Sequence, residues 1–147
     1  MSENAIETTP KNVIDVSGQY KGGEIRTLAK KNVKILGNLS ANSAQLGGKI
    51  DITAEKVKVE KAKIEAKGNY QGGKVRIGGD YLGGNITNLD NKIKTGFVSR
   101  FGDHPPIDNS KQTIVKADTN IDVSSDLGKG GTAIIWSDEM TYFNGTI

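Results

Sequence analysis

Residues 47–71 read GGKIDITAEKVKVEKAKIEAKGNYQ, and this stretch decides the fold. A pair of glycines is followed by three short runs in which every second residue is apolar. These apolar residues are Ile50 and Ile52, Val57 and Val59, and Ile64 and Ala66. Successive side chains of a β-strand point to opposite faces, so a period of two predicts strands with one apolar face. An amphipathic helix over residues 54–67 is the alternative, but the apolar positions do not follow a period of about 3.6.

The same unit recurs along the chain. Glycine pairs begin at Gly22, Gly47 and Gly72, each 25 residues after the last, and a fourth begins at Gly130. An alternating strand follows every pair, at residues 24–27, 49–52, 74–77 and 132–135. One such unit cannot bury its apolar stripe alone, but stacked units can. The repeat therefore predicts an all-β fold, a parallel β-helix (β-solenoid) of about four coils of roughly 25 residues.

The third and fourth glycine pairs are 58 residues apart, which leaves 33 residues more than one coil requires. We expect this excess to form one long inserted loop at about residues 83–116, with a short strand at 94–99. The remaining boundaries predict a disordered N-terminal tail over residues 1–11 and a single solenoid domain over residues 12–147. Long loops on a rigid scaffold often carry function, although a loop that merely covers one side of the stack is an equal alternative.

The charges are mixed rather than concentrated. The net charge of +3 is spread over interleaved acidic and basic residues, and only 5% of the residues are aromatic. A nucleic-acid-binding protein usually has a basic stripe with stacking aromatics, so we expect no nucleic-acid partner and a mostly solvated set of charges. Stacking the coils places Arg26, Asp51 and Arg76 in one outward column, where oppositely charged neighbours attract one another by about 0.2–1 kcal/mol.

Few residues indicate a catalytic or metal site. His104 is the only histidine and lies between Asp103 and two prolines, so a solvated loop residue is the simpler interpretation. The segment Gly78-Gly79-Asp80 is similar to one calcium-binding nonapeptide, but such sites need repeated copies. We therefore predict no catalytic, cofactor-binding or metal-binding residues, no cofactor and no enzymatic activity.

Two segments resemble a known family. The first combines residues 72–81 with residues 117–124 beyond the insertion, and the second combines residues 130–138 with residues 141–147. Both are similar in spacing and composition to the repeat region of filamentous-haemagglutinin-type two-partner-secretion exoproteins, which are adhesins. The resemblance covers most of the chain from residue 12 onward. It implies a right-handed β-helix and export through an outer-membrane transporter to the cell surface or the medium.

The resemblance also gives Trp136 a role and shows departures from the family. Trp136 is expected to close a corner, with stacking on a sugar as the alternative. Family members are usually very long and begin with a signal peptide and a secretion domain, and we expect neither in this chain. Ile147 follows Gly130 by 17 residues, so the chain is expected to be a fragment that stops inside a coil. Open strand edges at both ends would then favour end-to-end self-association.

These features predict a structural stalk or adhesion segment. Its partners would be host-cell or surface glycans or proteins, bound through the inserted loop and basic outward faces, and an outer-membrane transporter. A truncated, non-functional remnant of such a gene is one alternative. A carbohydrate-active β-helix enzyme is another, and it would need Asp51 or Asp80 in catalysis. The alternating outward column offers no pair of carboxylates for that chemistry.

Overall fold

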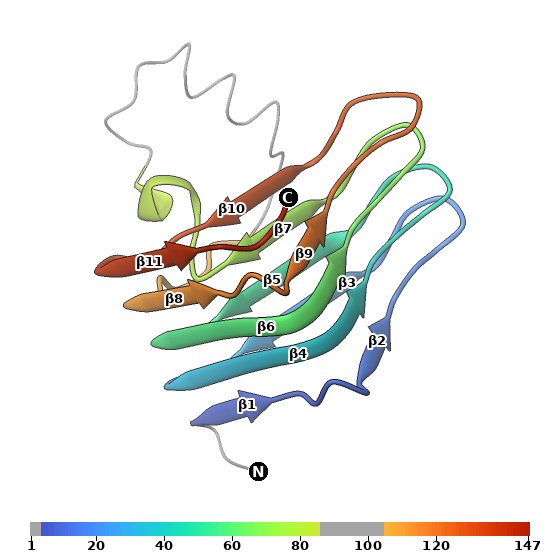
Figure 1. The fold of residues 1–147 in the computed structure, drawn as a ribbon. Helices are drawn as coiled ribbons and strands as arrows, with labels where there is room; N and C mark the ends of the chain where they lie inside the picture. The colour runs from blue at the N-terminus through green and yellow to red at the C-terminus, as the bar shows by residue number, and fades with distance from the viewer. Residues whose placement is uncertain (1–3, 86–104) are drawn as a thin grey trace.

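The computed structural model describes residues 4–85 and 105–147, which form stacked coils of β-strands (Figure 1). Neighbouring strands pair in parallel on every face of the described stack. The right-handed parallel β-helix predicted above is therefore confirmed. Within the described ranges, no helix has the length and apolar character needed to cross a membrane.

Each coil contributes one strand, or one half of a bent strand, to each of three faces. The first face stacks β1 (Ala5–Glu7), β4 (Asn32–Ser40), β6 (Lys56–Glu65), β8 (Gln112–Val115) and β11 (Met140–Phe143). The second face stacks β2 (Val13–Asp15), the C-terminal halves of β4 and β6, and β9 (Asn120–Asp122). The third face stacks β3 (Glu24–Leu28), β5 (Lys49–Thr53), β7 (Lys74–Ile77) and β10 (Thr132–Ile135). The first four coils are complete and β11 begins a fifth.

Strands β4 and β6 bend through a corner of the coil (Figure 1), so two of the three strands predicted for a unit form one continuous strand. Their register shifts between Ile35 and Gly37, where β6 carries an extra residue. Lys61 lies in this bulge with φ 48°, and its backbone N–H donates to Asp118 Oδ1 at 2.8 Å. A bulge bends a strand without ending it. The corner therefore needs no loop.

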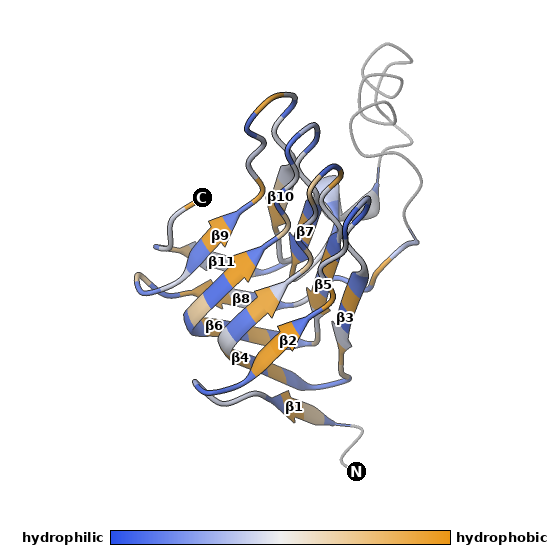
Figure 2. Cartoon of the chain, turned by 90° about the vertical axis from the view of Figure 1, so that its right-hand side faces the viewer, coloured by the Kyte–Doolittle hydropathy of each residue, from blue (hydrophilic) through white to orange (hydrophobic). Residues whose placement is uncertain are grey.

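The core is a set of aliphatic columns inside the coils. The parallel register places similar residues above one another, and the side chains of these columns are no more than 6% exposed. Two of the columns are Ile25–Ile50–Val75 and Leu39–Ile64–Ile121. Hydrophobic and hydrophilic residues alternate along the strands (Figure 2). Burying one such side chain contributes about 1.5–3 kcal/mol, so each stacked coil adds to the stability of its neighbours.

Two strands lie where the sequence predicted none. Strand β1 falls within the predicted tail and pairs with β4. Strand β8 falls within the predicted loop and turns Thr113 inward, where the buried hydroxyl donates to the carbonyl oxygen of Trp136 at 2.8 Å. A polar residue at an inward position hides the apolar alternation that identifies a strand. The strand predicted at 94–99 and His104 lie outside the described residues.

The first glycine of each of the first three pairs lies where adjacent coils approach closely. A Cβ at Gly47 would collide with the carbonyl oxygen of Ala66 and the amide nitrogen of Gly73 in the next coil. At Gly130, which opens the fourth pair, an added Cβ meets nothing within 4 Å. Close approach of the backbone therefore requires glycine at Gly47 but not at Gly130.

This difference predicts the outcome of a matched pair of substitutions. Gly47→Ala should lower the free energy of unfolding by about 1–3 kcal/mol, because the methyl group forces two coils apart. Gly130→Ala should change it by less than about 0.5 kcal/mol. Urea unfolding followed by circular dichroism measures both. Equal effects of the two substitutions would show that coil contact does not explain the glycine pairs.

Candidate functional site

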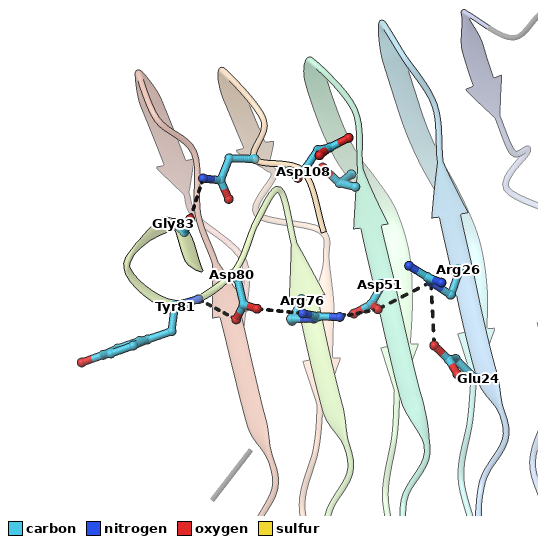
Figure 3. A network of polar contacts seen from close by, with 10 residues as sticks. Glu24, Arg26, Asp51, Arg76, Asp80, Tyr81, Gly83 and Asp108 are labelled. Carbon is cyan, nitrogen blue, oxygen red and sulfur yellow. Dashed lines mark hydrogen bonds and ion pairs between the residues drawn. The ribbon is translucent and has the colours of Figure 1, made fainter. Parts of the chain in front are cut away.

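A buried ion network lies on the outward side of the third face. Arg76 of β7 donates through Nε and Nη2 to both carboxylate oxygens of Asp51 on β5, at 2.7 and 2.6 Å. Its Nη1 donates to Asp80 Oδ2 at 2.8 Å (Figure 3). The exposed fractions are only 4% for Arg76, 3% for Asp51 and 6% for Asp80. One guanidinium thus holds two carboxylates, one of them in a bidentate pair.

The network extends the charge column predicted from the repeat. Arg26, Asp51 and Arg76 are neighbours in the strand register, and Arg26 Nε lies 3.9 Å from Asp51 Oδ2. The prediction of solvated charges is wrong for Asp51 and Arg76, which are buried, whereas the Arg26 side chain is 39% exposed. Asp80 is the third buried member, and the repeat does not reveal it because it follows β7 at the start of the insertion.

The charge of Arg76 is maintained by its two carboxylate partners. Burial acts to lower the pKa of Arg76, but the hydrogen bonds and charges of Asp51 and Asp80 outweigh it, and the pKa is raised. The guanidinium therefore stays charged. Both carboxylates are committed to this cation, so the site offers structural ion pairing rather than a general acid or base.

Asp80 also positions the start of the insertion. Its Oδ1 accepts a hydrogen bond from Tyr81 N–H at 2.7 Å and caps the short 3-10 helix η1 (Tyr81–Gly84). Gly78, with φ +84°, directly follows β7 and turns the chain out of the strand two residues before Asp80. The segment Gly78-Gly79-Asp80 is therefore a corner whose carboxylate binds Arg76. Among the described residues, no group of three or more His, Cys, Asp or Glu side chains is placed to hold a metal ion.

The returning end of the insertion is tied to the solenoid beside this network. Thr53 Oγ1 donates to the carbonyl oxygen of Asp108 at 2.6 Å, and the Ser110 N–H donates to the carbonyl oxygen of Gly78 at 2.6 Å. Asn109 Nδ2 donates to the carbonyl oxygen of Gly83 at 3.0 Å. These bonds join the departing end of the insertion, its returning end and strand β5, so both ends of the insertion are fixed on the scaffold.

An open groove of about 830 Å³ lies between this returning segment and the corners that follow β3 and β5. Its lining includes the cationic residues Arg26, Lys30 and Lys111, the acidic residues Glu55 and Asp108, and the apolar residues Leu28, Ala54, Pro106 and Ile107. Lys111 Nζ lies 2.6 Å from Glu55 Oε1, and its hydrogen bond and charge lower the pKa of that carboxyl. The groove therefore combines apolar walls with charged groups of both signs.

Trp136 lies against the corner that begins the insertion, as predicted. An added Cβ at Gly79 would contact the Trp136 ring at 2.8 Å, and the ring nitrogen donates to Asp138 Oδ1 at 3.1 Å. The indole therefore packs on the solenoid and is only partly exposed. This position favours corner closure over sugar stacking as the role of Trp136.

Ion pairs also connect the coils on the second face. Glu65 Oε1 of β6 lies 3.0 Å from Lys63 Nζ and 2.9 Å from Lys67 Nζ, and Lys67 Nζ lies 4.0 Å from Asp122 Oδ2 in the next coil. Burial acts to raise the pKa of Glu65, but hydrogen bonds from the two lysines prevail and the pKa is lowered. Burial likewise opposes the Ser124 hydrogen bonds that lower the pKa of Asp122. Both carboxylates therefore stabilise the fold in their ionised form.

One solved structure resembles this chain in both fold and sequence. The crystal structure of the HMW1 secretion domain from Haemophilus influenzae matches with a TM-score of 0.68 and 32% identity. The match covers 90% of this chain and 31% of that chain, so this chain spans about a third of the length of that structure. No protein-family model and no curated protein matches the chain.

This likeness confirms the resemblance to two-partner-secretion exoproteins. The structure that the chain resembles is a secretion domain, and the parallel coils described above fit a fragment of the repeat region predicted from the sequence.

The buried network predicts unequal effects of two arginine substitutions. Arg76→Ala should lower the free energy of unfolding by about 3–5 kcal/mol, because it leaves two buried carboxylates without their cation. Arg26→Ala should cost less than about 1 kcal/mol, because that side chain is partly solvated. Urea unfolding at constant ionic strength measures the difference. A cost for Arg76→Ala no greater than that for Arg26→Ala would contradict the assignment of Arg76 as the centre of the network.

The lowered pKa values of Glu65 and Asp122 predict acid destabilisation. A carboxyl whose folded pKa lies below its unfolded pKa stabilises the fold above the unfolded value, and this contribution disappears as pH falls through the folded pKa. The Tm should therefore fall between about pH 5 and about pH 2. Thermal unfolding across that range should show a shallower fall for Glu65→Gln, which does not titrate at this position. An unchanged slope would rule out the Glu65 contribution.

Proposed function

We propose that this chain is a structural, non-catalytic segment of an exported surface protein that acts in adhesion. The observation that carries the proposal is the likeness to a secretion domain at 32% identity over 90% of the chain. That structure belongs to a two-partner-secretion exoprotein, and the present chain spans a third of its length. The longer polypeptide would cross the outer membrane through a partner transporter and be displayed on the cell surface or released.

The stacked architecture supports a role in spacing and display. Each coil of the described stack is hydrogen-bonded to the next on three faces, and ion pairs such as Lys67–Asp122 connect successive coils. Stacked repeats of this kind form elongated, rigid scaffolds whose stability is a sum of contacts between neighbours. The segment would hold binding surfaces away from the membrane without needing a catalytic centre.

The groove beside residues 106–111 supports contact with surface molecules. Arg26 and Lys111 contribute cationic groups to its lining, and Leu28 and Ile107 contribute apolar surface. Such a groove would take a segment of an anionic surface glycan, with its acidic groups near the cations and its sugar rings on the apolar walls. Binding of this kind would weaken as salt concentration rises.

A carbohydrate-active enzyme is the less well supported alternative. Its acidic residues would be Asp51 and Asp80, and both are buried and bound to Arg76. A glycosidase needs two carboxyl groups that face a substrate from opposite sides of the scissile bond. The observed pairing therefore favours the structural role. Cell fractionation distinguishes that role from a truncated, non-functional remnant.

Fractionation of cells that make the protein tests the export proposal. An antibody against residues 1–147 should detect the antigen in the surface or culture fraction, and deletion of the partner transporter should remove it from both. Antibody against a cytosolic enzyme controls for lysis. An antigen confined to the cytosol, with or without the transporter, would contradict export and leave a non-functional remnant.

A further inference from the structure

The loops that join the second face to the third form a stacked edge with exposed tyrosines. These loops lie side by side along the solenoid (Figures 1 and 2). Gly18, Ser43 and Gly68 bridge in parallel at their starts, and Lys21, Leu46, Gln71 and Lys129 bridge in parallel at their ends. Residues at the same place in successive loops are therefore held in register by the backbone.

Tyr20, Gln45 and Tyr70 occupy one column of this edge. The amide of Leu46 donates to the carbonyl oxygen of Tyr20 at 3.1 Å, and the amide of Tyr70 donates to that of Gln45 at 3.0 Å. Tyr20 is 67% exposed and Tyr70 is 59% exposed. Gly128 continues the column above Tyr70, where it adds no side chain. Two aromatic side chains are thus presented to solvent, separated by one glutamine.

The spacing of the two rings is set by the coil. They lie two coils apart, and coils stack at about 4.8 Å, so the rings are on the order of 10 Å apart along a straight axis. In an extended β-1,4-linked chain of pyranose sugars, every second sugar presents the same face, and two sugars span a similar length. The C–H groups on a pyranose face carry partial positive charge and pack on the negative face of an aromatic ring.

A polar pocket of about 420 Å³ adjoins this column. Asn69, which precedes Tyr70, lines the pocket together with Asn42, Lys67, Asp122, Ser124 and Asp126. Amides, carboxylates and a hydroxyl are suited to hydrogen bonding with sugar hydroxyl groups. The charges at the pocket include one cation and two anions, and Lys67 is already paired with Glu65 at 2.9 Å. This balance opposes a polyanionic ligand such as a nucleic acid or a sulfated glycan.

We propose that the Tyr20–Tyr70 column and the adjoining pocket bind an uncharged, extended β-1,4-linked glycan laid along the solenoid axis. The inference deepens the proposed adhesive role and rests on it, since it names a glycan class that the segment contacts. It uses a surface distinct from the groove beside residues 106–111. Tyr20 and Tyr70 act as stacking platforms for two sugars of the chain. The pocket residues form hydrogen bonds that orient the sugar between these two.

Calorimetry with purified protein tests the site. N-acetylglucosamine hexasaccharide and cellohexaose are the uncharged probes, and a heparin hexasaccharide is the charged comparison. At least one uncharged probe should bind saturably, and the Tyr20→Ala/Tyr70→Ala double variant should raise its Kd at least about tenfold. The Tyr20→Phe/Tyr70→Phe variant should keep binding, because it retains both rings. Tyr142→Ala, which removes an exposed tyrosine from β11 instead, should bind normally.

Several results would overturn the proposal. These are no saturable binding of either uncharged probe, preference for the heparin probe, or full binding by the double alanine variant. A concentration-dependent dimer in sedimentation that the double alanine variant abolishes, without sugar binding, would assign the column to a second copy of the chain. If circular dichroism shows that the double alanine variant is unfolded, NMR of the wild-type chain replaces it. Tyrosine chemical shifts that do not change when the probes are added would then decide against the site.

Such a negative result leaves the export proposal standing, because fractionation of cells does not depend on sugar binding. Conversely, sugar binding by a chain that stays in the cytosol would support the site while removing its adhesive setting. The two experiments therefore separate failure of the binding site from failure of the proposed function.

Discussion

The parallel hydrogen bonding between one coil and the next is the constraint on which the rest of the structure depends. It places each residue against a partner close to one repeat away, as in the pairs Ile25–Ile50 and Ile50–Val75. The aliphatic columns, the glycine at the close approach of Gly47 and the charge column on the third face all follow from this register. A change at one position is therefore felt first in the neighbouring coils rather than in the neighbouring sequence.

The insertion shows what the fold must provide when the register is interrupted. The chain leaves β7 at Gly78 and returns to the stack in β8, and hydrogen bonds between Ser110 and Gly78 and between Asn109 and Gly83 join the two ends. Asp80 supplies a carboxylate to Arg76 at the same point. The buried charges thus fix the corner at which the chain leaves the stack.

The sequence allowed the fold class, the spacing of the coils and the core to be predicted, because Ile50, Ile52 and Ile64 alternate clearly and the glycine pairs recur. Strands β1 and β8 were missed, since Ala5–Glu7 carries little apolar signal and Thr113 faces inward through a hydrogen bond to a distant residue. Burial of Asp51 and Arg76 could not be predicted, because the register places them on an outward face. The alignment of Tyr20 with Tyr70 follows from the repeat, since the two residues are two repeats apart, whereas the exposure of both rings is known only from the structure.

Hydrogen–deuterium exchange of the purified chain tests the central claim most directly, that stability arises from stacking of each coil on its neighbours. Amides of β5, β6 and β7, which have a coil on both sides, should exchange most slowly. Amides of β1 and β11, which have a neighbour on one side only, should exchange fastest among the strands. Exchange at one uniform rate along the stack, or fastest exchange in β5 and β6, would contradict the account.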